Sequence, residues 1–208
     1  DDVPLEEELR RDIICPNCGL EHAVFGLATW CPDCGKDIFM CHVKTEFGVI
    51  QKVLSVVDKR REELGARVAG RDIENGLEDV VSVFEAVLKI ITIKHLANNG
   101  MSHDEISKRL EKIRNSYQNI NSAGETFHAQ TGLDLFHNTS QDEVETLRTI
   151  FEKRHPLTHN LGVVDKKYLE RVRTGDTEGR EIRVTAQEVE IAIGISKKII
   201  SSVYNLCT

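Results

Sequence analysis

The segment from Leu77 to Ala97, LEDVVSVFEAVLKIITIKHLA, sets the architecture of this chain. Its apolar residues recur at helical spacing and cover a wide face: Val80, Val81, Phe84, Val87, Leu88 and Ile91. A face of this width is typical of a central helix that neighbouring elements cover on most sides. Asn98-Asn99-Gly100 follows, and such residues commonly end a helix. The segment therefore predicts the core helix of an α-helical domain.

The segments around this helix predict further helices. Apolar residues recur at helical spacing between Glu46 and Leu64. Three Ser/Thr residues followed three positions later by Glu form capping boxes that begin helices: Ser102 with Glu105, Ser140 with Glu143, and Thr185 with Glu188. We expect the first of these helices to run to about Ile120.

Two segments between these helices are predicted to be irregular. Gly65–Gly76 contains three glycines and several charges, so it is interpreted as a connection. Asn121–Thr139 is mostly polar and is interpreted as a long loop. Only Glu181–Val184 alternates enough to suggest a strand in this part of the chain, so the fold class is all-α.

Composition limits the functions that fit this chain. Its 208 residues suit one domain of typical size with a small appendage. The net charge of −7 argues against a non-specific nucleic-acid coat, although a local basic cleft remains compatible with it. The most apolar stretch, Val80–Ile93, is interrupted by Glu85 and Lys89 and is too short for a membrane span. Asp1–Glu8 is acidic without a secretory pattern, so we expect a cytoplasmic protein with no membrane contact.

Four cysteines occur in two similar pairs, Cys15-Pro16-Asn17-Cys18-Gly19 and Cys31-Pro32-Asp33-Cys34-Gly35. Each CxxC pair makes a tight turn that directs two thiolates at one point, and the glycine that follows permits the backbone conformation of the turn. Two such turns supply the sulfur ligands of a tetrahedral zinc site. The repeated pattern resembles the zinc-ribbon family. We therefore expect a structural Zn²⁺ held by Cys15, Cys18, Cys31 and Cys34.

The expected zinc ribbon occupies residues 1–44, together with the acidic N-terminal segment. A pair of disulfides is the alternative, and it is disfavoured because nothing suggests export. Ala23–Trp30 is interpreted as strand material, with Trp30 packed against the site or, as the alternative, stacked on a base. Cys41 and His42 lie nearby, but the four cysteines already complete a structural site.

Arg154-His155-Pro156-Leu157-Thr158-His159 combines a phosphate-binding residue with residues that transfer protons. Arginine is a permanent cation that binds phosphate through parallel hydrogen bonds, and histidine titrates near neutral pH. Pro156 disfavours helix at His155 and suits the first turn of a following helix. We therefore expect Arg154 to end one helix and His159 to lie early in the next. In an unbroken helix the two would point about 140° apart, and the break would let both reach one cleft.

This hexapeptide resembles the R-x4–6-H motif of HEPN domains, small helical bundles found in many metal-independent endoribonucleases. The residue after the arginine is often polar in that family, and His155 agrees. The preceding Leu147–Lys153 and the following Asn160–Asp165 are also similar to HEPN sequences. The resemblance is clearest over Phe127–Val172, and by helix number it extends over residues 45–208.

The resemblance implies a homodimer in which two motifs form one composite cleft that binds RNA. His159 would assist removal of the ribose 2′-hydroxyl proton or protonate the leaving 5′-oxygen. Arg154 would hold the scissile phosphate, and His155 would position the phosphate or Arg154. The products would be a 2′,3′-cyclic phosphate and a 5′-hydroxyl. A toxin or antiviral defence effector would use such an activity, and the zinc would be remote from the chemistry.

Two other interpretations remain open at the level of sequence. A buried arginine and histidine at a helix junction can simply satisfy carbonyls and carboxylates. The helical domain would then be a non-catalytic HEPN scaffold or a nucleotide- or RNA-binding module. In that case the ribbon would bind a protein partner or a nucleic acid. A DNA-binding regulator is disfavoured by the charge of −7.

Overall fold

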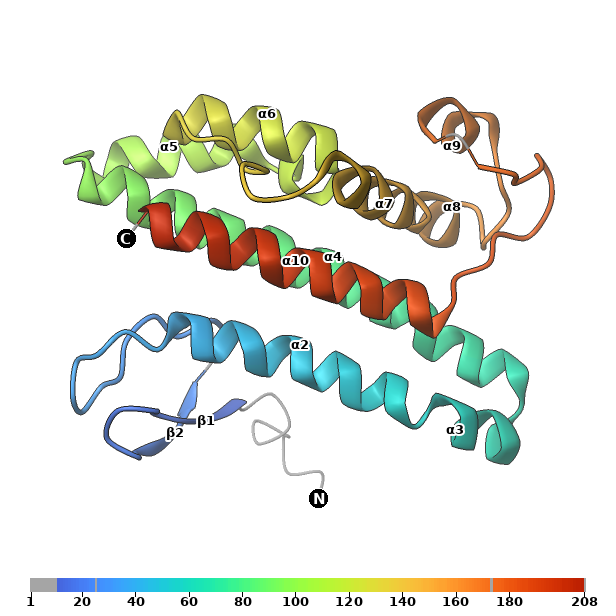
Figure 1. The fold of residues 1–208 in the computed structure, drawn as a ribbon, viewed down its shortest axis with the longest axis horizontal. Coiled ribbons are helices and arrows are strands. Elements are labelled where there is room, and N and C mark those ends of the chain that lie inside the picture. The colour runs from blue at the N-terminus through green and yellow to red at the C-terminus, as the bar shows by residue number, and fades with distance from the viewer. Residues whose placement is uncertain (1–10, 25, 173, 208) are drawn as a thin grey trace, which may run out of the picture. The chain divides into compact units, whose positions relative to one another are not determined.

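A computed structural model describes residues 11–24, 26–172 and 174–207. The chain forms two compact units, Asp1–Val49 and Ile50–Thr208. A two-stranded sheet lies in the first unit and every other regular element of the described chain is helical (Figure 1). This confirms the expected fold class, an all-α fold preceded by a small β element.

The first unit is built on a short antiparallel hairpin. Strand β1 (Arg11–Ile14) pairs with β2 (Glu21–Val24), with Ile13 opposite His22. Around the hairpin, a small buried cluster consists of Ile13, Cys15, Cys31 and Ile38. The predicted strand Ala23–Trp30 overlaps β2 only at its start, and Trp30 forms a single bridge to Asp37.

Helix α2 (Phe39–Ser55) begins in the first unit and ends in the second, and α3 (Val57–Leu64) follows. The predicted helical character between Glu46 and Leu64 is confirmed, but the helix begins earlier, at Phe39, and is interrupted at Val56. The earlier start follows from apolar residues that continue upstream, since Phe39, Val43 and Phe47 are all buried at intervals of four. An Asp37 carboxylate oxygen accepts the Phe39 N–H at 3.0 Å and supports the first turn.

Helix α4 spans Ala66–Asn98, so the prediction of a connection over Gly65–Gly76 is wrong. Only Gly65 turns the chain, with a φ of 89°. Ala69, Ile73 and Gly76 are buried along one helical face, and Gly76 lies close to side chains of α2 and α10, which a Cβ at this position would meet at ordinary van der Waals distances. Burial of this face outweighs the cost of a helical glycine, about 1 kcal/mol each. Despite the length of α4, no helix in the described ranges is long and apolar enough to cross a bilayer.

The chain after α4 folds into α5 (His103–Ile113), a 3-10 turn η1 (Ser116–Gln118) and α6 (Ile120–Thr131). The capping box of Ser102 and Glu105 is confirmed, but α5 ends before the predicted Ile120. The predicted loop Asn121–Thr139 is wrong from Asn121 to Thr131, all of which is helical. Its polar composition hid buried residues of α6, and the Asn119 side chain caps this helix by accepting the Ser122 N–H.

The last helices are α7 (Gln141–Glu152), α8 (Arg154–His159), α9 (Lys166–Arg171) and α10 (Ala186–Cys207). The predicted capping boxes at Ser140 and Thr185 are both present. Within the second unit α10 packs against α4 and α7, and α4 also contacts α5, α6, η1 and α8 (Figure 1). The predicted core helix is therefore central to this unit.

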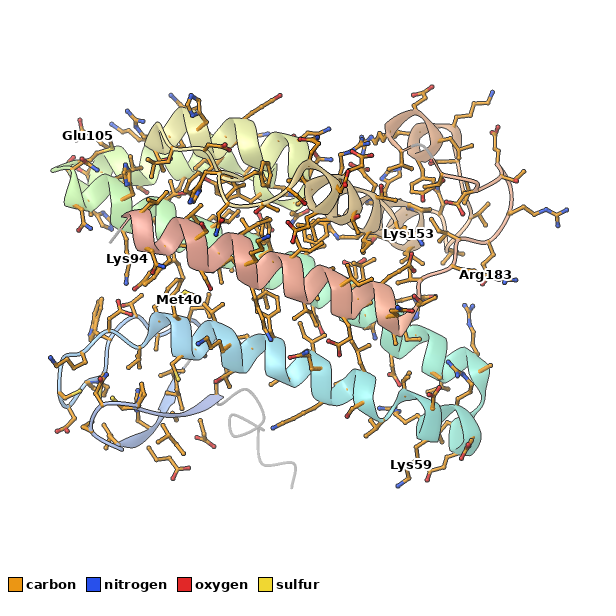
Figure 2. All side chains as sticks on the ribbon, in the orientation of Figure 1. Met40, Lys59, Lys94, Glu105, Lys153 and Arg183 are labelled. Carbon is orange, nitrogen blue, oxygen red and sulfur yellow. The ribbon has the colours of Figure 1, made fainter. Side chains whose placement is uncertain are left out.

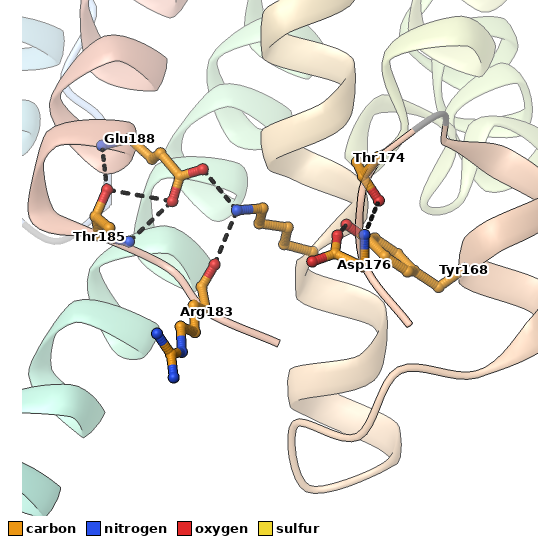
Figure 3. Close-up of polar contacts among 7 residues, drawn as sticks. Tyr168, Thr174, Asp176, Arg183, Thr185 and Glu188 are labelled. Atoms are coloured by element: carbon orange, nitrogen blue, oxygen red, sulfur yellow. Dashed lines mark hydrogen bonds and ion pairs between the residues drawn. The ribbon is translucent and has the colours of Figure 1, made fainter. Parts of the chain in front are cut away.

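Lys153 fixes the junction between α7 and α8 to the segment that leads into α10. Figure 2 marks Lys153 and Arg183 on the fold, and Figure 3 shows the contacts: Lys153 Nζ donates to the Arg183 carbonyl at 2.8 Å and to Glu188 at 2.5 Å. Nearby, the Tyr168 hydroxyl donates to Asp176 at 2.8 Å (Figure 3). These contacts hold the chain after α9 against the end of α7. Glu181 forms only an isolated bridge to Val163, so the possible strand at Glu181–Val184 does not extend.

Candidate metal centre and candidate active site

The four cysteines of the first unit come together as the sequence predicts. The sulfurs of Cys15, Cys18, Cys31 and Cys34 all lie within 4.8 Å of one another. Two of the separations, Cys15 to Cys34 and Cys18 to Cys31, are 3.7 Å, and all four cysteines are free. Metal–sulfur bonds of about 2.3 Å in a tetrahedron place sulfurs about 3.8 Å apart. The cluster therefore has the geometry to hold a metal ion.

Two similar turns position these sulfurs. In the first turn, the Cys15 N–H donates to the Leu20 carbonyl and the Gly19 N–H to the Cys15 carbonyl, both at 2.9 Å. In the second turn, the equivalent donors are Cys31 and Gly35. Gly19 has a φ of 76° and Gly35 a φ of 65°. This left-handed conformation favours glycine, so the turns depend on the glycine that follows each CxxC pair.

The environment of Cys15 favours its thiolate. Burial raises the pKa of this thiol, but backbone N–H groups of Cys18 and Asn17 and the neighbouring thiols outweigh burial and lower the pKa to about 6. The Asn17 N–H lies 3.4 Å from the sulfur. Because the thiolate is the form that binds metal, this arrangement prepares Cys15 as a ligand.

His42 and Cys41 do not join the cysteine cluster. His42 is fully buried, and its Nδ1 accepts the Ala28 N–H at 2.7 Å. Its Nε2 lies 3.2 Å from a Glu46 carboxylate oxygen. His42 therefore links the loop before Trp30 to α2 within the first unit.

The expectation that Trp30 packs against the cysteine site is wrong. The side chain is 66% exposed, although it directly precedes Cys31. Tryptophan is rarely exposed to this degree in a folded domain. A single backbone bridge, outside the two-stranded sheet, joins Trp30 to Asp37.

In the second unit, Pro156 breaks the helix at a different position from the one predicted. Helix α7 ends at Glu152, and Arg154, His155 and His159 all lie in the short helix α8. Proline lacks the N–H that would bond to the carbonyl four residues earlier, which here belongs to Glu152. The break therefore falls before Arg154, and Pro156 occupies the first turn of α8.

Spacing of four residues, rather than five, organises the side chains of α8. Arg154 and Thr158 both donate to the carboxylate of Glu78 on α4. His155 and His159 face each other with ring centroids 5.1 Å apart. Residues four apart share one face of a helix. The prediction considered only Arg154 and His159, which are five apart, and so missed both of these pairs.

The guanidinium of Arg154 is held at two of its nitrogens. Nε donates to Glu78 at 3.0 Å, and one terminal nitrogen donates to Gln118 at 2.7 Å. Gln118 in turn donates to Glu85 at 2.6 Å. This chain of contacts fixes the guanidinium plane and leaves N–H donors of its terminal nitrogens for a ligand.

His155 is neutral over more of the pH range than an exposed histidine. Burial lowers its pKa, and the cations Lys167 and Arg171 act in the same direction, while the Asp165 carboxylate opposes them. That carboxylate lies 3.5 Å from His155 Nε2 and accepts the Asn160 side-chain N–H at 2.6 Å. A neutral imidazole can accept a proton, as a general base must.

One cavity of about 200 Å³ brings the three predicted residues together. It is lined by Asn115, Gln118, Asn119, Phe151, Glu152, Arg154, His155, Thr158, His159 and Arg171. The buried carboxylate of Glu152 accepts hydrogen bonds from Asn119 and from Arg171, the latter at 3.2 Å. The cavity therefore combines two arginines, two histidines and several amides within a single chain.

Sequence reasoning did not find Glu78, Gln118 or Asn119. They lie far from the motif in sequence or on other helices, so no local pattern connects them to it. Thr158 could have been found, because it stands four residues after Arg154.

No known family model matches this chain, and no curated protein or solved structure is significantly similar to it. The HEPN resemblance therefore stays a prediction.

Proposed function

We propose that this protein is a metal-independent endoribonuclease of the HEPN type. The observation that carries the proposal is the cavity in which Arg154, His155 and His159 meet. Cleavage of an RNA phosphodiester needs a cation for the phosphate and groups that move two protons, and this cavity supplies both.

In the proposed reaction the ribose 2′-oxygen attacks the phosphorus and the bond to the 5′-oxygen breaks. One histidine accepts the 2′-hydroxyl proton, and a protonated histidine gives a proton to the departing 5′-oxygen. The lowered pKa of His155 suits it to the accepting role, which extends the positioning role that the resemblance implied. His159 would then protonate the leaving group. The products are a 2′,3′-cyclic phosphate and a 5′-hydroxyl.

Arg154 would bind the scissile phosphate through its remaining terminal donors. Glu78 and Gln118 support this role because they orient the guanidinium without occupying all of its N–H groups. A fixed donor stabilises developing charge without reorganising during the reaction.

The proposal includes a homodimer that completes the site. The cavity in one chain measures about 200 Å³. Typical ligand pockets are larger, with volumes of about 300 to about 1000 Å³. The cavity can hold a phosphate and part of a nucleotide, so a second copy of the motif would supply the rest of the cleft.

We further propose that the cysteine cluster holds a structural Zn²⁺. Four thiolates at tetrahedral spacing are a common zinc site, and four protein ligands leave no position for catalysis. The ion would supply folding free energy to the first unit rather than chemistry.

The test is RNA cleavage by the purified protein in the presence of EDTA, beside Arg154→Ala and His159→Ala variants. We expect cleavage by the wild type, with cyclic phosphate ends, and a loss of at least about 100-fold in both variants. A wild type without activity, or equal cleavage by all three proteins, would sink the proposal.

The exposed Trp30 favours a second candidate, in which the ribbon binds a partner and the helical unit is a non-catalytic scaffold. Trp30 and Ile14 are 66% and 60% exposed on this small unit. Aromatic residues of this kind often anchor interfaces. Capture of a partner that Trp30→Ala abolishes, together with no RNA cleavage by the wild type, would favour this candidate.

A further inference from the structure

The end of helix α5 carries a concentration of positive charge that the proposed active site does not use. Lys108, Lys112 and Arg114 line one shallow hollow and are all exposed, and we call them the α5 basic surface. The segment Lys108–Arg114 contains four basic residues and one acidic residue, a net charge of +3 in a chain whose net charge is −7. The surface is therefore a local exception in an acidic protein.

These charges are not neutralised by neighbouring carboxylates. In the described part of the chain, no ion pair forms at Lys108, Lys112 or Arg114 within 4.0 Å. Glu111 is the one acidic residue that lines the same hollow. Lys108 and Lys112 are one helical turn apart, so both side chains project from the same face.

The surface ends one residue before the proposed active site begins. Arg114 lines the hollow, and the next residue, Asn115, lines the cavity that contains Arg154. Consecutive Cα atoms are about 3.8 Å apart, so the backbone of α5 brings the edges of the two depressions close to each other. Arg114 has a φ of 46°, an uncommon conformation for a residue with a side chain. This turn ends α5 and leads into η1, where Gln118 holds Arg154.

We infer that the α5 basic surface binds the phosphates of an RNA strand on one side of the scissile bond. The inference rests on the proposed function, because it extends the substrate of that same site. Unpaired cations bind phosphates without regard to base, so the contact would be independent of sequence. A substrate of several nucleotides would therefore be preferred over a dinucleotide.

The experiment measures binding of a labelled single-stranded RNA of about twelve nucleotides as a function of salt. His159→Ala is the parent, so that the RNA stays intact. The test variant adds Lys108→Gln, Lys112→Gln and Arg114→Gln, which removes three positive charges and keeps long side chains at these positions. The matched control instead adds Lys52→Gln, Lys59→Gln and Arg61→Gln, which removes the same charge from α2 and α3.

Each phosphate neutralised on a single strand contributes about −0.7 to the slope of log affinity against log salt. We expect the test variant to lose about 2 from this slope and at least about tenfold in affinity at low salt. The control should keep the parent slope. A test variant with the parent slope, or an equal loss in the control, would overturn the inference. A polyglutamate peptide that binds with the same affinity and slope as the RNA would also overturn it.

A cleavage assay on proteins that keep His159 distinguishes a failure of this inference from a failure of the proposed function. The three substitutions should lower cleavage of the longer RNA by about tenfold and leave cleavage of a dinucleotide unchanged. An equal loss on both substrates would contradict the inference while the proposed function stands. If no protein cleaves RNA, the proposed function fails, and the salt slopes still decide whether α5 binds RNA.

Discussion

The two units of this protein are held together in different ways. Before α2 begins, the described residues of the first unit between Arg11 and Ile38 bury only Ile13, Cys15, Cys31 and Ile38, and two of these are cluster cysteines. The second unit buries a continuous face along α4 and α10. Units below about 40 residues seldom fold on apolar burial alone. The contrast supports the proposal that a metal ion at the cysteine cluster stabilises this segment, whereas apolar packing stabilises the second unit.

The proposed active site belongs to the second unit. The residues that line the cavity all lie between Asn115 and Arg171, within the second unit. Loss of the metal centre should therefore leave the proposed site in place. Substitutions chosen in one unit should accordingly disturb that unit and spare the other.

The largest effect is expected for Cys31→Ser, which removes a ligand from the cysteine cluster. Structural zinc contributes about 10–16 kcal/mol in small zinc domains near neutral pH, so most of the stability of the first unit should be lost. Hydrogen exchange should become fast in residues 11–38 and stay slow in α4. RNA cleavage should persist.

Cys41→Ser is the control for this change, because Cys41 lies outside the cluster and should leave the metal content of the protein unaltered. Slow exchange throughout the Cys31→Ser protein would show that the first unit does not depend on the cluster.

The second effect concerns Leu88→Ala in the core of the helical unit. Leu88 is fully buried, and such truncations cost about 2–5 kcal/mol. Urea denaturation followed by circular dichroism should show this loss, while the metal content of the folded protein stays the same. The control is Leu206→Ala, because Leu206 is half-exposed. Its unfolding free energy should change by at most about 0.5 kcal/mol, and equal losses in both variants would contradict the assigned core.

The contrast between the units also explains what sequence could predict. The CxxC pairs and capping boxes act through neighbouring residues, so their spacing was sufficient to predict the cysteine cluster and three helix starts. Gly65–Gly76 was mispredicted because Gly76 is buried beside α2 and α10, and a local pattern does not show burial against helices that are distant in sequence. Glu78 escaped prediction for the same reason, since its contact with Arg154 exists only after α4 and α8 pack together. The packing of Trp30 was mispredicted because the neighbouring sequence does not show which side of the turn faces solvent.

A third prediction concerns Glu78, which positions Arg154 without a place in the proposed reaction. Glu78→Gln should lower kcat for RNA cleavage by about tenfold, equivalent to about 1.4 kcal/mol, because the guanidinium loses its charged anchor. KM should not rise, since removal of a negative charge does not weaken attraction to phosphate. Glu74→Gln on the same helix is the control, because Glu74 pairs with Arg71 instead. A kcat equal to that of wild type would show that Arg154 does not need Glu78.

A smaller effect is expected for Ser140→Ala at the start of α7. The Ser140 hydroxyl accepts the Glu143 N–H, and loss of such a cap costs about 1 kcal/mol. Thermal unfolding of the helical unit should shift downward by a few degrees, with no effect on the cysteine cluster. Ser140→Asp, which can also cap a helix, should restore stability. An unchanged midpoint in Ser140→Ala would contradict the role of this box.

The smallest effect concerns the pH dependence of the second unit. Because burial lowers the pKa of His155, the unfolded chain binds its proton more readily than the folded chain. The contribution of His155 to stability is therefore complete above about pH 6.5 and is lost as the pH falls through its folded pKa. His155→Gln should make the urea midpoint less dependent on pH between about 5 and 7. The exposed His103→Gln should keep the wild-type dependence, and equal slopes in all three proteins would contradict the shift.

The position of Trp30 has a practical consequence for studies of this protein. It is the single tryptophan of the chain, and it stands beside Cys31. The three tyrosines, Tyr117, Tyr168 and Tyr204, all belong to the helical unit. Selective excitation of the indole therefore observes the ribbon alone, and tyrosine emission follows the bundle. The two halves of the molecule carry separate optical reporters, so their unfolding can be monitored in one cuvette without an added label.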